Sequence, residues 1–218
     1  MIRRHGSGAF TMIDPSAFAR GFALSAALIV AIGAQNMFVL RQGLRREHVG
    51  PIVLFCAACD ALLITAGVTG LGMVLRLVPG LALILSLGGA SFLAWYGATA
   101  LRRATQPDAM ILSDQAAAMP LGATLGRAAG FTLLNPHVYL DTVLLMGTVG
   151  SSQAAGTQPI FIAGAASASV IWFTSLGYGA RLLTPLFARP MAWRVLDLLV
   201  GLTMLGLALG LLMHLVRG

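Results

Sequence analysis

The sequence alternates between long apolar stretches and short polar connections. Each apolar stretch approaches or exceeds the roughly 20 residues that a helix needs to cross about 30 Å of hydrocarbon at about 1.5 Å per residue. Turn-forming and charged residues, such as those at 45–48 and 79–80, separate the stretches. The pattern predicts an all-α integral membrane protein with six transmembrane helices, at about residues 16–40, 49–75, 80–101, 127–150, 159–180 and 194–216.

One long polar connection, at about residues 102–126, divides these spans into two groups of three. We therefore expect a single membrane domain over residues 1–218, with a first repeat at about 16–101 and a second at about 127–216. Because each repeat has an odd number of spans, the second copy enters the membrane upside down. Inverted three-helix repeats of this kind are typical of secondary transporters.

Composition supports a membrane location. The chain is 58% hydrophobic and 10% charged, with a mean hydropathy of +0.87. Soluble domains carry about 25% charged residues, so a soluble enzyme is excluded. All 14 basic residues are arginines, and they lie near the ends of the apolar stretches. This placement follows the positive-inside rule and gives no reason to expect a nucleic-acid partner, despite the net charge of +7.

The arginine distribution also predicts an orientation. The connections after the first, third and fifth spans hold nine arginines and the opposite side holds five, which places both termini outside the cytoplasm. The first span resembles a secretory signal peptide, but its apolar residues continue to Leu40, too far for a signal core. We expect it to be retained. Either Met1 or Met12 could be the translation start.

Two carboxylates fall well inside predicted spans, Asp60 in the second and Asp141 in the fourth. Ionisable groups at membrane depth are costly and therefore usually functional. No lysine or arginine accompanies either one at helical spacing, so its countercharge must be a proton, a bound cation or an arginine on another helix. Asp197 differs, because it lies near the start of the last span and could pair with Arg194 at the interface.

Polar helix breaks are expected at corresponding places in the two halves. Proline lacks a backbone donor and clashes with the preceding turn, and glycine permits a similar irregularity. Broken helices are tolerated at membrane depth where they line a cavity, because their freed amides and carbonyls bind water or solute. A histidine at such a break could relay protons. The residues concerned are Gly33, Gln35 and Asn36 in the first span and Asn135, Pro136 and His137 in the fourth.

Two cysteines, Cys56 and Cys59, immediately precede Asp60. A Cys-x-x-Cys pair beside a carboxylate could hold a soft metal ion, whereas free cysteine inside an apolar helix is usually a small buried hydrophobe. We predict no metal and no cofactor. No nucleophile–base arrangement, phosphate loop or metalloprotease motif is present, so we do not expect an enzyme.

Three stretches of this sequence resemble the LysE-type family of basic amino-acid exporters. They are residues 33–44 (Gly-Ala-Gln-Asn-Met-Phe-Val-Leu-Arg-Gln-Gly-Leu), residues 60–64 with Gly67 and Gly70, and residues 134–142 (Leu-Asn-Pro-His-Val-Tyr-Leu-Asp-Thr). The resemblance covers all six predicted spans and the central connection. Related exporters of neutral amino acids have a Pro-Gly-Pro type of break where this chain has Gly-Ala-Gln-Asn, which favours a basic substrate.

The resemblance implies a dimeric, multi-pass exporter of the bacterial inner membrane that is driven by ion gradients. Our hypothesis is the export of arginine, lysine or a close analogue by alternating access and cation/proton exchange. Its partners would be the cationic amino acid, membrane lipid and a second copy of the chain. The alternatives are an exporter of metals or other cations, an exporter of neutral amino acids, and a membrane-embedded enzyme or scaffold. The candidate substrate-binding residues are Gly33, Gln35, Asn36, Asp60, Asn135, Pro136 and Asp141, and the proton-coupling candidates are Asp60, Asp141 and His137.

Overall fold

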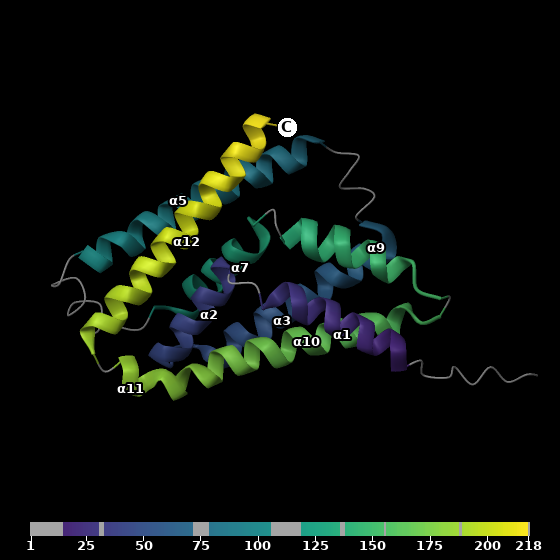
Figure 1. The fold of residues 1–218 in the computed structure, drawn as a ribbon, viewed down its shortest axis with the longest axis horizontal. Coiled ribbons are helices and arrows are strands. Elements are labelled where there is room, and N and C mark those ends of the chain that lie inside the picture. The colour runs from purple at the N-terminus through teal and green to yellow at the C-terminus, as the bar shows by residue number, and fades with distance from the viewer. Residues whose placement is uncertain are drawn as a thin grey trace, which may run out of the picture.

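The computed structural model describes residues 15–30, 33–71, 79–105, 119–135, 138–154, 156–187 and 189–217. Helix is the regular structure found throughout these residues, which confirms the all-α prediction (Figure 1). The first half contains α1 (Pro15–Ile29), α2 (Ala34–Arg45), α3 (Val49–Ala66) with its continuation η1 (Gly67–Leu71), and α5 (Pro79–Thr105). The second half contains α7 (Leu121–Leu133), η2 (Tyr139–Leu145), α9 (Met146–Ser151), α10 (Gln158–Gly179), η3 (Ala180–Leu183), α11 (Thr184–Phe187) and α12 (Pro190–Arg217).

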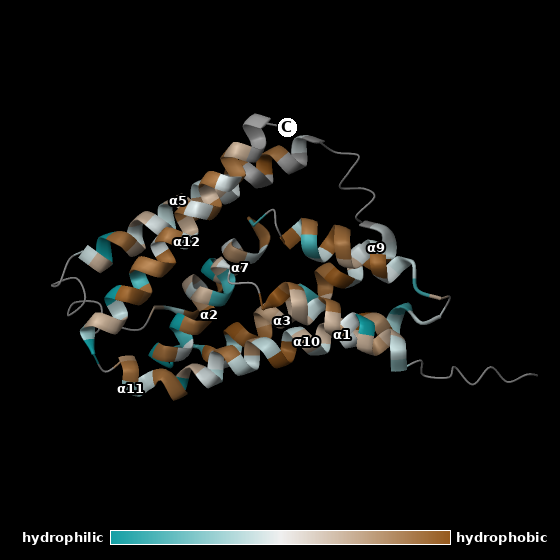
Figure 2. Cartoon of the chain, viewed as in Figure 1, coloured by the Kyte–Doolittle hydropathy of each residue, from teal (hydrophilic) through white to brown (hydrophobic). Residues whose placement is uncertain are grey.

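Three of the described helical segments are long and apolar enough to cross a membrane, namely Val49–Gly70, Gln158–Phe187 and Pro190–Met213. The pair formed by α1 and α2 would make a fourth, with a bend of 81° between its two helices. Apolar residues predominate along these segments, and polar residues are grouped at a few places (Figure 2). The all-helical, membrane-spanning character of the chain therefore agrees with the hydropathy pattern. The sequence predicts six spans, and three or four of them are met by helices of this length and composition among the described residues.

Both predicted helix breaks occur. The predicted span at 16–40 is divided between α1 and α2, and Gly33 is the residue that caps the start of α2. The predicted span at 127–150 begins earlier, at Leu121, and is divided between α7 and η2. The Tyr139 hydroxyl donates to the Leu133 carbonyl oxygen at 2.8 Å, which satisfies an acceptor that the end of α7 leaves free. Pro136 and His137 lie outside the described residues.

The helices of the two halves pack against one another in a reciprocal way. In each half, the broken helix packs on the second helix of the other half, so that α1 and α2 contact α10, while α7, η2 and α9 contact α3 and η1. The two second helices, α3 and α10, also contact each other. The third helices, α5 and α12, lie side by side along one edge of the molecule (Figure 1).

Glycines allow α1 and α10 to approach closely. An added Cβ at Gly164 would lie 2.2 Å from the Phe18 carbonyl oxygen, and one at Gly21 would lie 2.0 Å from the Phe161 carbonyl oxygen. In lipid, helix association depends on such close contact because the solvent itself is apolar. A side chain at either position would therefore require the two helix backbones to move apart.

A buried ion cluster joins α12 to the first half of the chain. The Asp197 side chain is only 3% exposed, and its carboxylate accepts hydrogen bonds from Arg41 on α2 and, at 3.2 Å, from Arg103 on α5. The predicted pairing of Asp197 with Arg194 at the interface is therefore wrong. Asp197 faces the neighbouring helices instead, where two guanidinium groups compensate its charge in an environment of low polarity.

We expect Asp197→Asn to lower the midpoint of thermal unfolding in detergent strongly, because it leaves two guanidinium groups without their carboxylate. Breaking a buried ion pair typically costs about 3–5 kcal/mol. Glu47→Gln is a matched control, since Glu47 pairs with Arg45 at 3.1 Å where both side chains are partly exposed, and such pairs contribute about 0–1 kcal/mol. Equal midpoints for the two variants would contradict a structural role for the cluster.

The α1–α10 contact gives a second stability prediction. Gly164→Ala should destabilise the protein by about 1–3 kcal/mol through overpacking against Phe18. Gly206→Ala on α12 is the control, because an added Cβ at Gly206 meets no atom within 4 Å of it, and alanine in a helix interior is normally slightly stabilising. The midpoints of thermal unfolding of both variants, measured in the same detergent, test this prediction. An unchanged midpoint for Gly164→Ala would show that α1 and α10 can move apart without loss of stability.

Candidate functional site

A cavity of about 280 Å³ lies between the two helix breaks. This volume is just below the range of roughly 300–1,000 Å³ found for small-molecule sites. Its walls come from α1, α2, α3, the α7–η2 break and η2, with single contributions from α9, α10 and α12. The residues predicted from the sequence that line it are Gly33, Gln35, Asn36, Asp60, Asn135 and Asp141.

The first turn of α2 forms one wall of the cavity. Gly33 caps this helix without a side-chain hydrogen bond, and the Met37 amide makes the first bond of the helix, to the Gly33 carbonyl oxygen at 3.1 Å. The amides at 34–36 precede that bond and have no partner within the helix. Together with the helix dipole, they give this wall a positive potential that suits an anionic group.

Asn36 connects the two parts of the first broken helix with α10. Its Nδ2 donates to the Ile29 carbonyl oxygen at 2.7 Å, and its Oδ1 accepts from Trp172 Nε1 at 3.2 Å. The side chain therefore satisfies a carbonyl at the end of α1 and fixes the start of α2. Asn36 lines the cavity as the sequence predicts, but these contacts show that it also holds the break in shape. The part played by Trp172 has no signal in the hydropathy pattern.

Asp60 stands on α3 and is partly buried. Its Oδ2 accepts a hydrogen bond from Ser169 Oγ on α10 at 2.9 Å. Ser169 itself is only 1% exposed, so its hydroxyl is committed to this contact in an apolar surrounding. Ser169 and Trp172 are three residues apart and therefore share one face of α10. A single helix of the second half thus positions Asp60 and Asn36 of the first half.

Gln35 brings a poorly satisfied donor to the cavity. Its Nε2 is buried and meets no oxygen or nitrogen acceptor among the described residues. The side chain lies next to the Cys56 thiol on α3, which is at most a weak acceptor, and it lines the cavity. A buried amide with so weak a partner is unfavourable, and a ligand or a water molecule in the cavity would satisfy it.

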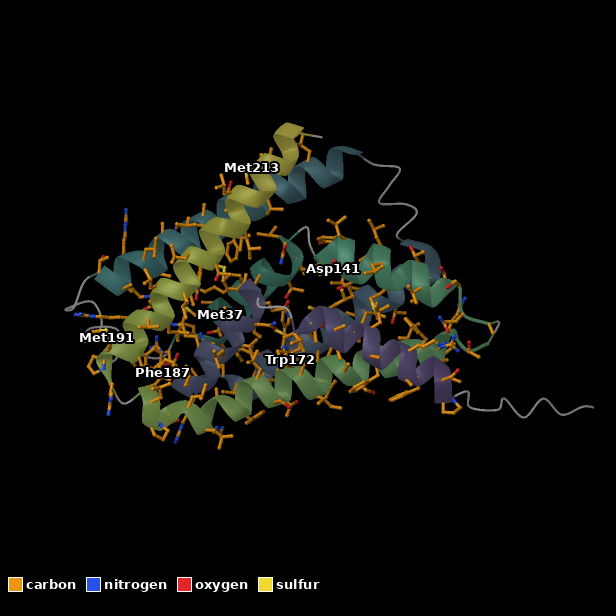
Figure 3. All side chains as sticks on the ribbon, in the orientation of Figure 1. Met37, Asp141, Trp172, Phe187, Met191 and Met213 are labelled. Carbon is orange, nitrogen blue, oxygen red and sulfur yellow. The ribbon has the colours of Figure 1, made fainter. Side chains whose placement is uncertain are left out.

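Asp141 approaches the cavity from a different element. It lies on η2, a π-helical segment of a type that often occurs at functional sites. Figure 3 shows Asp141, Met37 and Trp172 around the same central region, on η2, α2 and α10. Within the described part of the chain, no hydrogen bond or ion pair reaches the Asp141 carboxylate. Both of its oxygens are therefore available to a bound group.

The cavity has an unbalanced charge. Two of its lining residues, Asp60 and Asp141, carry carboxyl groups, and none of the described lining residues is basic. Among the described residues, no arginine from another helix supplies the countercharge at this wall, and a proton or a bound cation would serve instead. The described residues contain no group of three histidine, cysteine or acidic side chains that could hold a metal. The arrangement suits an organic solute with both a cationic and an anionic end.

Comparison with known proteins identifies the family. Residues 26–215 match the family model described as LysE type translocator. The chain belongs to this family. Because the family consists of translocators, the prediction of a transmembrane transport protein that is not an enzyme is confirmed. No solved structure matches this transporter.

Curated relatives cover most of the transporter. It is 47% identical over 193 residues to YggA of Aeromonas salmonicida, whose name assigns it provisionally to amino-acid transport, with 88% of this chain and 93% of the relative covered. It is 41% identical over 184 residues to the arginine exporter protein ArgO of Yersinia enterocolitica, with 84% and 90% covered. A relative from Mycobacterium bovis, again named provisionally as an amino-acid transporter, is 46% identical over 181 residues, with 83% and 89% covered.

Trp172→Phe tests the support of the first break. The substitution keeps an aromatic ring but removes the donor to Asn36, and one hydrogen bond is worth about 0.5–1.5 kcal/mol. We expect transport activity at low substrate concentration to fall by about 2–10-fold while the amount of protein in the membrane is maintained. Trp193→Phe is the control, because Trp193 donates to the Phe187 carbonyl oxygen, away from the cavity. Equal activities in the two variants would show that the Trp172 hydrogen bond does not contribute to transport.

Proposed function

We propose that this transporter exports arginine, lysine or a close analogue. The observation that carries the proposal is the cavity lined by two carboxylates and by the first turn of α2. A basic amino acid has two cationic groups and one carboxylate, and these charges complement such walls. The family membership and the similarity to a protein named arginine exporter support the same substrate class. Asp60 and Asp141 would neutralise the α-ammonium and side-chain cations, and Gln35, Asn135 and the α2 amides would hold the polar end.

Alternating access requires two halves that can rearrange around the site. We propose six spans arranged as two inverted repeats, with α5 and the α7–η2–α9 unit supplying the two spans beyond α1–α2, α3, α10 and α12. The reciprocal packing supports this plan, because each broken helix contacts the second helix of the other half. A two-fold relation between the halves would produce this set of contacts. Homodimer formation and the location of both termini outside the cytoplasm stay predictions of the sequence.

The membrane field constrains the mechanism. Moving one positive charge outward against an inside-negative potential costs about 2.3 kcal/mol per 100 mV. A passive pore in a bacterial inner membrane would therefore retain a cationic amino acid. Exchange with one proton is electroneutral, and exchange with two protons uses the potential to drive export. Protonation of Asp60 or Asp141 as the substrate leaves is the simplest coupling device, and His137 is a further candidate.

Intracellular amino-acid pools give the direct test. Cells that lack basic amino-acid exporters are fed arginine- or lysine-containing dipeptides, with and without this protein. Expression should lower the internal pool of arginine or lysine several-fold, and Asp60→Asn should abolish the effect because the cavity loses a carboxyl group that can carry either a negative charge or a proton. The matched control is Glu47→Gln, which makes the same chemical change outside the cavity and should retain export.

The same assay can refute the substrate assignment or the role of Asp60. Unchanged arginine and lysine pools, with the protein confirmed in the membrane, would refute the basic substrate. Neutral amino acids and metal ions would then be measured in the same cells. Normal export by Asp60→Asn would leave the substrate assignment intact and remove Asp60 from the mechanism.

A further inference from the structure

The two carboxylates of the cavity have different neighbours. Asp60 belongs to a connected group around the start of α2, since α10 contacts both Asp60 through Ser169 and Asn36 through Trp172. Gln35 lies next to Cys56, which is one helical turn before Asp60 on α3. The negative charge of Asp60 and the positive first turn of α2 are therefore adjacent walls of the cavity.

Asp141 is not part of this hydrogen-bonded group. It lies on η2, and the cavity-lining residues close to it in the chain are Val138, Thr142 and Met146. No described residue donates to its carboxylate, whereas one oxygen of Asp60 is already occupied by Ser169. Asp141 can therefore offer both oxygens to one planar group.

The chemistry of a basic amino acid matches this difference between the surroundings of Asp60 and Asp141. Its α-ammonium and α-carboxylate groups are attached to a single carbon, so the site for this end needs an anion and a set of donors side by side. The cation of the side chain lies several bonds away and needs a separate anion. A guanidinium group binds most strongly to a carboxylate that accepts two parallel hydrogen bonds.

We propose that Asp60 and the first turn of α2 bind the α-ammonium and α-carboxylate end of the cargo, and that Asp141 binds its side-chain cation. This assignment rests on the proposed function. It makes Asp141 the residue that distinguishes basic from neutral amino acids, while Asp60 is required for any α-amino acid. Ser169 is a positioning residue, because its hydrogen bond holds the Asp60 carboxylate beside α2.

Binding of arginine and citrulline to the purified full-length protein in detergent tests the assignment. Citrulline has the same α-amino-acid end and nearly the same shape as arginine, but its side chain is neutral. The wild type should bind arginine at least about tenfold more tightly than citrulline, because only arginine gains a charge-assisted contact. Asp141→Asn should reduce that ratio to about one through loss of arginine affinity. Asp60→Asn should weaken the binding of both ligands.

Ser169→Ala supplies a second variant with a smaller perturbation. It should weaken the binding of arginine and of citrulline by the same factor, about 2–10-fold, and leave the ratio of their affinities unchanged. Ser169→Thr keeps the hydroxyl and should restore most of the affinity. Ser167→Ala is the matched control, since the Ser167 hydroxyl donates to the Ala163 carbonyl oxygen of its own helix and does not line the cavity. This variant should bind both ligands as the wild type does.

The outcomes separate the two proposals. A wild type that binds neither arginine nor lysine more tightly than citrulline would refute the basic substrate itself. A wild type that prefers arginine, combined with an Asp141→Asn variant of unchanged ratio, would overturn the division of roles and leave the export function standing. A changed ratio in Ser169→Ala would also overturn the division, because it would place the side-chain cation at Asp60, and this readout does not require the Asp141 variant to fold.

Discussion

The buried carboxylate of Asp197 is the constraint on which the arrangement of the helices depends. In lipid there is no water to solvate such a group, so it must be compensated by the protein itself. Arg41 on α2 and Arg103 on α5 provide that compensation. The cluster fixes the second half of α2, while Asn36 fixes its first turn through contacts with Ile29 and Trp172. Because α2 is held at both ends, its amino terminus stays at the cavity wall.

The three carboxylates in the described helices differ in their partners. Asp197 has two arginines and is structural. Asp60 has a neutral donor, Ser169, and Asp141 has no partner within the described part of the chain. A carboxyl group that is not neutralised by the protein can exchange its countercharge, and this is what a cation/proton exchanger requires. Under the proposed function an arginine at the cavity would be unfavourable, since it would compete with the cargo for the two acids.

Local sequence features predict the cavity residues but not what holds them. Asp60, Asp141 and the two helix breaks are recognisable because charged or helix-breaking residues are conspicuous in apolar spans. Their partners are separated from them by 109 residues for Ser169 and Asp60 and by 136 for Trp172 and Asn36. The Arg41–Asp197 pair spans 156 residues, and the nearer Arg194 is the more obvious partner in the sequence. Serine and tryptophan in an apolar helix carry no pattern that specifies such contacts.

The two helix breaks also differ in which backbone groups they leave without hydrogen-bond partners. In the second half, the Tyr139 hydroxyl satisfies the Leu133 carbonyl oxygen at the end of α7. In the first half, Asn36 satisfies the Ile29 carbonyl oxygen, but no side chain caps the amides at the start of α2. Backbone groups at membrane depth require partners, and these amides face a cavity that has acidic side chains on its other walls. An anion alone would be repelled by those acids, so the solute that satisfies the α2 amides must itself carry positive charge, as an amino acid does.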